Sequence, residues 1–91
     1  MALQIIEMMI IWDEPRRQSN ILKHGLDFAD LGPEFFLSSY TEPVRLGRIL
    51  AIGQVGGIMV VAVVYRPLGL EAVSVISMRP ANPSERSRAN G

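Results

Sequence analysis

Three short apolar segments in the second half of the chain constrain its fold most strongly. They span residues 48–53, 58–66 and 70–77, and Gly-containing turns at 55–57 and 67–69 separate them. Short apolar segments joined by tight turns are typical of an antiparallel meander. The middle segment is apolar on both of its faces, so we expect it to be the central strand and to be covered on both sides.

A strand followed by a helix is expected near the start of the chain. Residues 5–12, IIEMMIIW, are apolar and rich in β-formers, which predicts a mostly buried first strand. Asp13 can cap the helix that follows, Pro15 fits its first turn, and Gly25 fits the left-handed position that ends a helix. The helix is therefore predicted over 14–24. The residues expected to face the core are Ile21, Leu22 and Gln18.

A second helical stretch is predicted after the first, either kinked or divided into two short pieces. Asp27 suits a helix N-cap, and the aromatic and aliphatic residues that follow it have helical spacing. Gly32 and Pro33 interrupt that spacing, because proline removes a backbone donor inside a helix. Residues 38–47 are polar and contain both proline and glycine, so we expect a loop there.

A short final helix is predicted from the residues around Asn82. Asn82 can cap its start, Pro83 fits its first position, and Glu85 stands where it can complete a capping box. A chain of 91 residues has room for one core, so a single domain over 1–91 is expected. The fold class is α+β: an N-terminal strand, two helices packed on one face of an antiparallel sheet with a C-terminal three-strand meander, and a short terminal helix.

Some classes of protein are excluded by what the sequence lacks. The chain has no cysteine, which excludes disulfides and thiolate metal sites. Its longest apolar run, 58–65, is too short to span a bilayer. No basic stretch precedes the apolar N-terminal residues, so we expect no signal peptide and a cytoplasmic location. With one histidine and scattered carboxylates, no metal site and no cofactor are expected.

The zero net charge hides a difference between the two halves of the chain. Residues 1–44 hold three basic and seven acidic side chains, whereas residues 45–91 hold six arginines and two glutamates. The planar guanidinium fork of arginine suits phosphate and carboxylate groups. A polyanion or an acidic partner could therefore bind one face of the protein. The alternative is that these arginines are simply solvated at the surface.

Several motifs, taken in order, resemble one family. They are WDEP at the start of the first helix, N-x-x-KHG at 20–25, DFAD with EFF after it, Arg48 five residues ahead of Gly53, VVY in the middle strand and VISMRPANPSER near the end. Over about residues 10–88 the chain resembles the BrnT family of bacterial type II toxins, which are small ribonucleases with a RelE/ParE-like fold. The resemblance implies an RNA substrate and a BrnA-like antitoxin with a ribbon-helix-helix domain, through which alone operator DNA is contacted.

Cleavage of RNA makes three chemical demands. The 2′-hydroxyl has to lose a proton, the charge that develops around phosphorus has to be stabilised, and the leaving 5′-oxygen has to gain a proton. Because no metal is needed when the 2′-hydroxyl is the nucleophile, cationic side chains and a histidine suffice for this chemistry. The candidate catalytic residues are Arg79, Arg48, His24 and Lys23.

Most of these candidates also have a structural alternative. Arg79 lies between a strand and a proline, which fixes its backbone for contact with a phosphate, but it could instead pair with Glu85. Arg48 matches an arginine of the family. His24 belongs to the residue type that exchanges protons near neutral pH, although it could also bond a carbonyl at the helix end. Lys23 could contact a phosphate or be a solvated surface lysine.

Two further residues, Tyr65 and Arg86, are candidates for substrate binding. The Tyr65 ring could stack on a base, or it could belong to the core. The function predicted from the resemblance is a metal-independent endoribonuclease toxin that cleaves mRNA. The alternative is a catalytically attenuated or inactive relative that binds the antitoxin and acts in repression of its own operon. A small protein of unrelated role is a third possibility.

Overall fold

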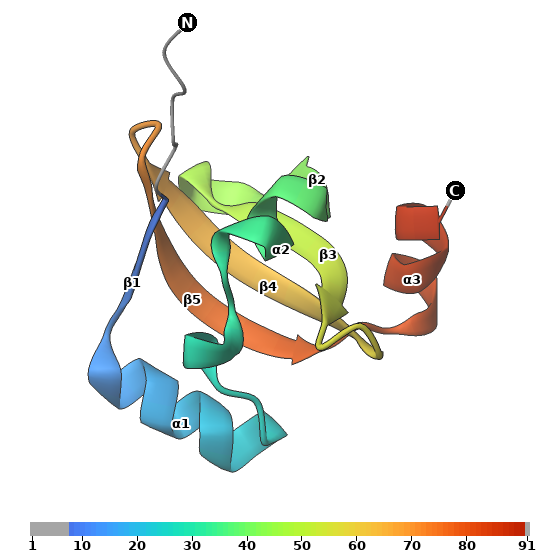
Figure 1. Cartoon of the computed structure of the whole chain (residues 1–91), viewed down its shortest axis with the longest axis horizontal. Helices are drawn as coiled ribbons and strands as arrows, with labels where there is room; N and C mark the ends of the chain where they lie inside the picture. Colours follow the sequence, from blue (N-terminus) through green and yellow to red (C-terminus); the bar gives the residue numbers. More distant parts are fainter. Residues whose placement is uncertain (1–7, 91) are drawn as a thin grey trace, which may run out of the picture.

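The computed structural model describes residues 8–90, and its centre is a five-stranded sheet with the strand order β1-β5-β4-β3-β2 (Figure 1). The strands are β1 (Met9–Trp12), β2 (Tyr40–Pro43), β3 (Ile49–Val55), β4 (Met59–Leu68) and β5 (Ala72–Pro80). Strands β3, β4 and β5 form the predicted antiparallel meander, and β4 is its central strand. The meander and the α+β class are confirmed.

Strand β2 lies within the loop that was expected over residues 38–47, so that prediction was wrong for residues 40–43. It pairs antiparallel with β3, from Tyr40 opposite Ile52 to Pro43 opposite Ile49. This strand has no outer neighbour among the described residues. A proline is tolerated at such an edge, because the side of the strand that lacks an N–H donor has no partner strand to bind. Its polar, proline-containing sequence therefore concealed a strand.

Strand β1 pairs with β5 in the parallel direction, with Met9 opposite Ala72 and Trp12 opposite Val75. The sheet is therefore mixed, and the prediction of an antiparallel sheet was wrong for β1. The direction in which β1 joins the sheet depends on pairing with residues some sixty positions away, which a local pattern cannot reveal. The first part of the predicted strand, residues 5–7, lies outside the described residues.

Helix α1 (Glu14–His24) has the predicted ends. The Asp13 carboxylate accepts a hydrogen bond from the Arg16 backbone N–H at 3.1 Å, and Gly25 ends the helix at φ 67°. The predicted inward face was partly wrong, because Gln18 is exposed and the Leu22 side chain is 88% exposed. The buried residue of α1 is Asn20, so this helix meets the sheet through an amide.

The second helical stretch forms two short pieces, as predicted, and builds the main core together with strands β3, β4 and β5. They are the 3₁₀ helix η1 (Phe28–Asp30) and helix α2 (Pro33–Ser38). The Asp27 carboxylate accepts from the Ala29 N–H at 2.9 Å and caps the first piece. Helix α2 and η1 cover one face of the sheet, whereas α1 lies against β5 (Figure 1), so packing of both helices on one face stays a prediction. The main core cluster consists of Phe28, Leu31, Phe35, Phe36, Ala51, Val61, Val63, Val73, Val75 and Met78.

Helix α3 (Pro83–Asn90) packs against the other face of the sheet. The predicted capping box is present: the Glu85 N–H donates to Asn82 Oδ1 at 2.8 Å, and the Asn82 N–H donates to Glu85 Oε1 at 3.0 Å. A small apolar cluster that includes Leu50, Ile52 and Ala62 lies on this face. Beyond that cluster the face is hollowed and lined by arginines, and we call this region the open face.

Candidate functional site

The open face carries a row of side chains that crosses three neighbouring strands. Arg66 of β4 lies opposite Ser74 of β5. Tyr65 lies opposite Ile49 of β3, so the next position along places Arg48 beside Arg66. The alternation of side chains along each strand puts Arg48 and Arg66 on the open face, away from Tyr65.

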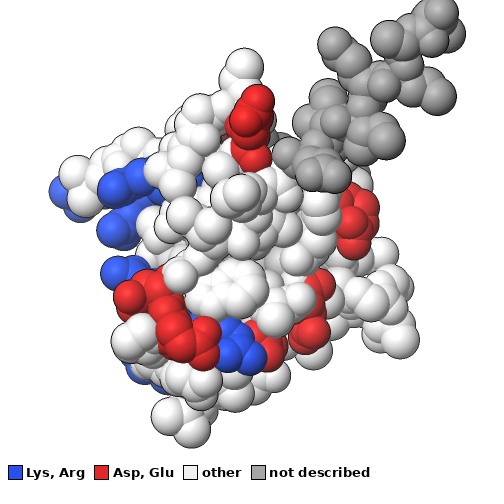
Figure 2. All heavy atoms as spheres, turned by 60° about the vertical axis from the view of Figure 1, so that its left-hand side comes forward, with Lys and Arg blue, Asp and Glu red and all other residues white. Residues whose placement is uncertain are grey.

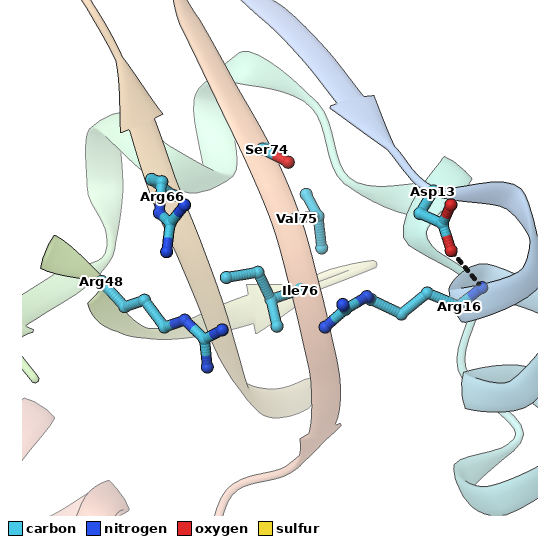
Figure 3. A pocket seen from close by; sticks show the side chains of 7 residues that line it. All are labelled: Asp13, Arg16, Arg48, Arg66, Ser74, Val75 and Ile76. Atoms are coloured by element: carbon cyan, nitrogen blue, oxygen red, sulfur yellow. Dashed lines mark hydrogen bonds between the residues drawn. The ribbon is translucent and has the colours of Figure 1, made fainter. Parts of the chain in front are cut away.

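Arg16 of α1 reaches the same region from the side. A hollow of about 180 Å³ separates α1 from the row on the sheet. Figure 3 shows Arg48 and Arg66 reaching into it from the sheet and Arg16 from the helix, with Ile76 between them. We call this the arginine hollow; its lining residues are Asp13, Arg16, Arg48, Arg66, Ser74, Val75 and Ile76.

The three guanidinium groups of this hollow retain free hydrogen-bonding capacity. None of them forms an ion pair within residues 8–90. Arg48 Nε is buried without a hydrogen-bond partner, and Arg66 makes one long contact, 3.5 Å from Nη2 to the Leu46 carbonyl oxygen. The Asp13 carboxylate is directed to the start of α1 (Figure 3). Arg16 and Arg66 were not predicted from the sequence as site residues. The alternation of side chains along β4 could have indicated that Arg66 lies on the face of the sheet opposite to Tyr65.

Arg79 lines a second, more open hollow that adjoins the first. This outer hollow has a volume of about 540 Å³ and is lined by Val44, Arg45, Leu46, Arg48, Leu50, Val64 and Arg79. Arg48 belongs to both hollows. The outer hollow is thus lined by four apolar side chains and three arginines.

Arg79 is also held by Glu85 of α3. Its Nη1 and Nη2 each donate to one carboxylate oxygen at 2.7 Å, and Nη1 lies 3.4 Å from the Pro80 carbonyl oxygen. Hydrogen bonds from Arg79 lower the pKa of Glu85 to about 2, and the same pair raises the pKa of Arg79. The ion pair that was the structural alternative for Arg79 is therefore present, and contact with a phosphate stays a prediction.

Lys23 and His24 lie in the last turn of α1 and line a third hollow of about 240 Å³. We call it the helix-end hollow; its lining residues are Arg16, Ser19, Asn20, Lys23, His24, Ile76 and Ser77. Arg16 and Ile76 are shared with the arginine hollow. The three hollows therefore form one continuous track that brings Lys23, His24, Arg48 and Arg79 to the same side of the protein.

Asn20 links the helix that carries Lys23 and His24 to the strand that carries Arg79. Its Nδ2 donates to the Met78 carbonyl at 2.9 Å and to the Leu26 carbonyl at 3.0 Å, and its Oδ1 accepts from the Met78 N–H at 3.0 Å. Buried amide groups are normally hydrogen-bonded, because an unpaired polar group is costly to remove from water, and the Asn20 amide is bonded through both of its polar atoms. Sequence reasoning missed this role, although Asn20 begins the N-x-x-KHG motif.

Tyr65 and Arg86 are not brought onto this track. The Tyr65 ring packs edge-to-face against Phe36, with ring centres 5.1 Å apart, on the side covered by α2. Burial raises the pKa of its hydroxyl. Arg86 is exposed on α3 and lines none of the three hollows. Contact of either residue with a substrate stays a prediction.

The surface charge follows this arrangement. Lys and Arg side chains gather towards one margin of the view in Figure 2, on the side that lies behind the sheet in Figure 1. Three arginines form ion pairs within residues 8–90. Arg17 pairs with both Glu14 and Asp27, Arg79 pairs with Glu85, and Arg88 pairs with Glu42. The cations of the arginine hollow are not among them, so this hollow is a positively charged part of the surface.

Two further properties concern the described residues as a whole. Residues 8–90 contain no group of three His, Cys, Asp or Glu side chains placed to hold a metal ion. None of their helices has the length and apolar character needed to cross a membrane.

A small α+β domain of this kind, with a cationic track across an open sheet face, is suited to binding a polyanion. The model of the protein family described as the ribonuclease toxin, BrnT, of type II toxin-antitoxin systems matches residues 12–85. The chain belongs to the BrnT family of ribonuclease toxins, and the resemblance noted in the sequence is confirmed.

A solved structure also supports membership of the BrnT family. The crystal structure of the Brucella abortus ribonuclease toxin, BrnT, matches with a TM-score of 0.78 and 59% sequence identity. The match covers 82% of this chain and 97% of that one. A search of curated proteins gave no match.

Proposed function

We propose that this protein is an endoribonuclease that cleaves mRNA in the cytoplasm by attack of the 2′-hydroxyl, without a metal ion. The observation that carries the proposal is the continuous track of basic side chains on the open face, from Lys23 and His24 to Arg48 and Arg79. These side chains are of the types that can move a proton and stabilise charge on a phosphorane.

The proposed roles are matched to the chemistry of each side chain. His24 takes the proton from the 2′-hydroxyl, and the 2′-oxygen forms a bond to phosphorus. Arg48 and Arg79 stabilise the negative charge that develops on the phosphoryl oxygens, and Lys23 holds a neighbouring phosphate. The bond from phosphorus to the 5′-oxygen breaks, and water supplies the proton to that oxygen. The products are a 2′,3′-cyclic phosphate and a 5′-hydroxyl.

The pair formed with Glu85 supports a rigid placement of Arg79. The carboxylate fixes the guanidinium before substrate arrives, and the remaining N–H donors stay available to a phosphoryl oxygen. A preorganised cation at a developing oxyanion is among the largest contributions to catalysis.

The same pair also favours a second candidate function. Because Glu85 already satisfies part of Arg79, the chain is alternatively an attenuated or inactive toxin that binds the antitoxin and represses its own operon. In both cases we propose a BrnA-like ribbon-helix-helix antitoxin as the partner, with operator DNA contacted through it alone. We further propose that residues 1–91 form one domain of RelE/ParE-like fold, supported by the single five-stranded sheet with α2 on one face and α3 on the other.

Expression in cells distinguishes the two functions. Induction without the antitoxin is expected to arrest growth and to fragment mRNA, and co-expression of the antitoxin is expected to restore growth. The matched control is a His24→Ala, Arg48→Ala double variant, checked for solubility. Normal growth with soluble, folded wild-type protein would favour the inactive module.

A further inference from the structure

The arginine hollow has the features of an anion-binding site. Two of its arginines, Arg16 and Arg66, are not among the proposed catalytic residues. We propose that Arg16 and Arg66, together with Arg48, which also faces the cleaved phosphate, bind the neighbouring backbone phosphate of the RNA. This inference rests on the proposed function, and it assigns Arg16 and Arg66 to substrate binding.

The first observation is unsatisfied hydrogen-bonding capacity. Three guanidinium groups from α1, the start of β3 and β4 converge on one hollow (Figure 3), and none has a carboxylate partner within residues 8–90. Arg48 Nε is buried and lacks any acceptor. A buried donor without a partner costs free energy, and like charges held together repel. A bound anion removes both costs.

The second observation is that nothing in the hollow already takes the place of the anion. Asp13 is its one acidic lining residue, and its carboxylate accepts the Arg16 backbone N–H at the start of α1. Ser74, which lies opposite Arg66, is uncharged, and Ile76, which lies between the arginines (Figure 3), has no polar side-chain atom. The volume of about 180 Å³ is several times the ~30 Å³ that one water occupies in the liquid.

The third observation separates this hollow from Arg79. The Arg79 guanidinium is committed to Glu85 through two bonds of 2.7 Å, whereas the guanidinium groups of Arg16 and Arg66 are not paired with any described carboxylate. A phosphate that needs a bidentate arginine finds it in the arginine hollow. Arg48 borders both hollows and therefore connects the bound phosphate to the site beside Arg79.

The position of the hollow indicates a polyanion in preference to a single acidic side chain of a protein partner. The hollow shares Arg16 with the helix-end hollow and Arg48 with the outer hollow, so cations continue in both directions. An RNA strand has phosphates at regular intervals that can use the whole track. A single carboxylate would contact only the arginine hollow at the centre of the track.

Binding of an uncleavable strand tests the proposal. A short 2′-deoxy oligonucleotide, which lacks the nucleophile, is titrated into ¹⁵N-labelled protein, and the arginine Nε–Hε signals are followed by NMR. We expect the signals of Arg16, Arg48 and Arg66 to shift together, and inorganic phosphate to shift the same three at higher concentration. Unmoved Arg48 and Arg66 signals at saturation would overturn the proposal.

Charge-matched variants give the second readout. Arg16→Gln and Arg66→Gln are each expected to weaken oligonucleotide binding by about tenfold and to reduce the salt slope of log K by about one. The control is Arg88→Gln, which removes the same charge from an arginine already paired with Glu42. Circular dichroism verifies that each variant is folded. Equal losses in Arg88→Gln and Arg66→Gln would show general charge attraction and overturn the site.

The outcomes separate this inference from the proposed function. If the wild type cleaves RNA while Arg16→Gln and Arg66→Gln bind the oligonucleotide as the wild type does, the phosphate site is wrong and the function stands. If the three arginines respond to the oligonucleotide but RNA is never cleaved, the site stands and the function fails. Variants that lose affinity only for the antitoxin would assign the hollow to an acidic partner residue and overturn the phosphate site.

Discussion

The guanidinium of Arg79 and the carboxylate of Glu85 are joined by two hydrogen bonds of 2.7 Å, and this pair connects β5 to α3. The Glu85 side chain is 5% exposed and the Arg79 side chain 40%. Glu85 also accepts the Asn82 N–H, so one carboxylate both caps the helix and holds the arginine. The stability of the C-terminal helix and the placement of the arginine therefore depend on the same residue.

Removal of the Glu85 charge is expected to destabilise the protein in a pH-dependent way. Its pKa falls from the ordinary 4.5 to about 2 in the folded state, so the pair stabilises fully above pH 4.5 and is lost as the pH falls towards 2. Glu85→Gln should lower the free energy of unfolding by about 1–2 kcal/mol at pH 7, after allowance for the water that reaches Arg79. Urea titrations at pH 7 and pH 2.5 measure it. A difference between the two proteins that does not shrink at low pH would contradict this.

Arg79 is predicted to carry the largest share of catalysis. Arg79→Ala should lower the rate of RNA cleavage by about two orders of magnitude, because a preorganised donor at the oxyanion is lost. Arg79→Lys should restore only part of the rate, since an ammonium group has no bidentate fork. Single-turnover rates on one RNA measure both variants.

The control for Arg79 must remove its structural role, because Arg79→Ala alone leaves Glu85 buried without its partner. The double variant Arg79→Gln, Glu85→Gln replaces the ion pair with two neutral amides. If its stability recovers while its cleavage rate stays low, Arg79 acts on the substrate. Recovery of both stability and rate would mean that Arg79 acts through the fold alone.

His24 is expected to contribute less than Arg79. It lies at the end of α1, next to Gly25, and makes no side-chain hydrogen bond within residues 8–90, so it is held less rigidly than Arg79. His24→Ala should reduce cleavage by a smaller factor than Arg79→Ala in the same assay. Near-wild-type activity of Arg79→Ala combined with an inactive His24→Ala would reverse the two assignments.

Asn20 is predicted to be a structural requirement for the site. Asn20→Ala removes three hydrogen bonds and leaves backbone groups of Met78 and Leu26 without a partner, at roughly 1–3 kcal/mol for each buried group. We expect Tm to fall by at least about 8 °C. Ser19→Ala, on the neighbouring exposed position, should change the free energy of unfolding by less than about 0.5 kcal/mol. A small effect of Asn20→Ala in calorimetry would show that this link is dispensable.

Features of the fold that depend on local chemistry could be predicted from the sequence. The ends of α1 follow from Asp13 and Gly25, and the start of α3 follows from Asn82 with Glu85. Each of these signals acts within a few residues. The meander is likewise local, because glycine-containing turns join consecutive strands.

Features that depend on distant partners could not be predicted in this way. The parallel pairing of β1 with β5 is set by contacts between residues far apart in the chain. The burial of Asn20 in place of Leu22 depends on a backbone segment of β5 that needs an amide. The convergence of Arg16 with Arg66 brings a helix to a strand fifty residues later, so only the folded chain reveals it.

The most direct test of the proposed function is cleavage of a defined RNA by the purified protein in excess EDTA, with chemical analysis of the new ends. Cationic side chains on the open face are proposed to do the work of a metal, so cleavage should persist in EDTA and leave 2′,3′-cyclic phosphate and 5′-hydroxyl ends. The same RNA with 2′-deoxy substitution at the cleaved position should remain intact. Loss of cleavage in EDTA with recovery in magnesium, or cleavage of the 2′-deoxy RNA, would contradict the proposal.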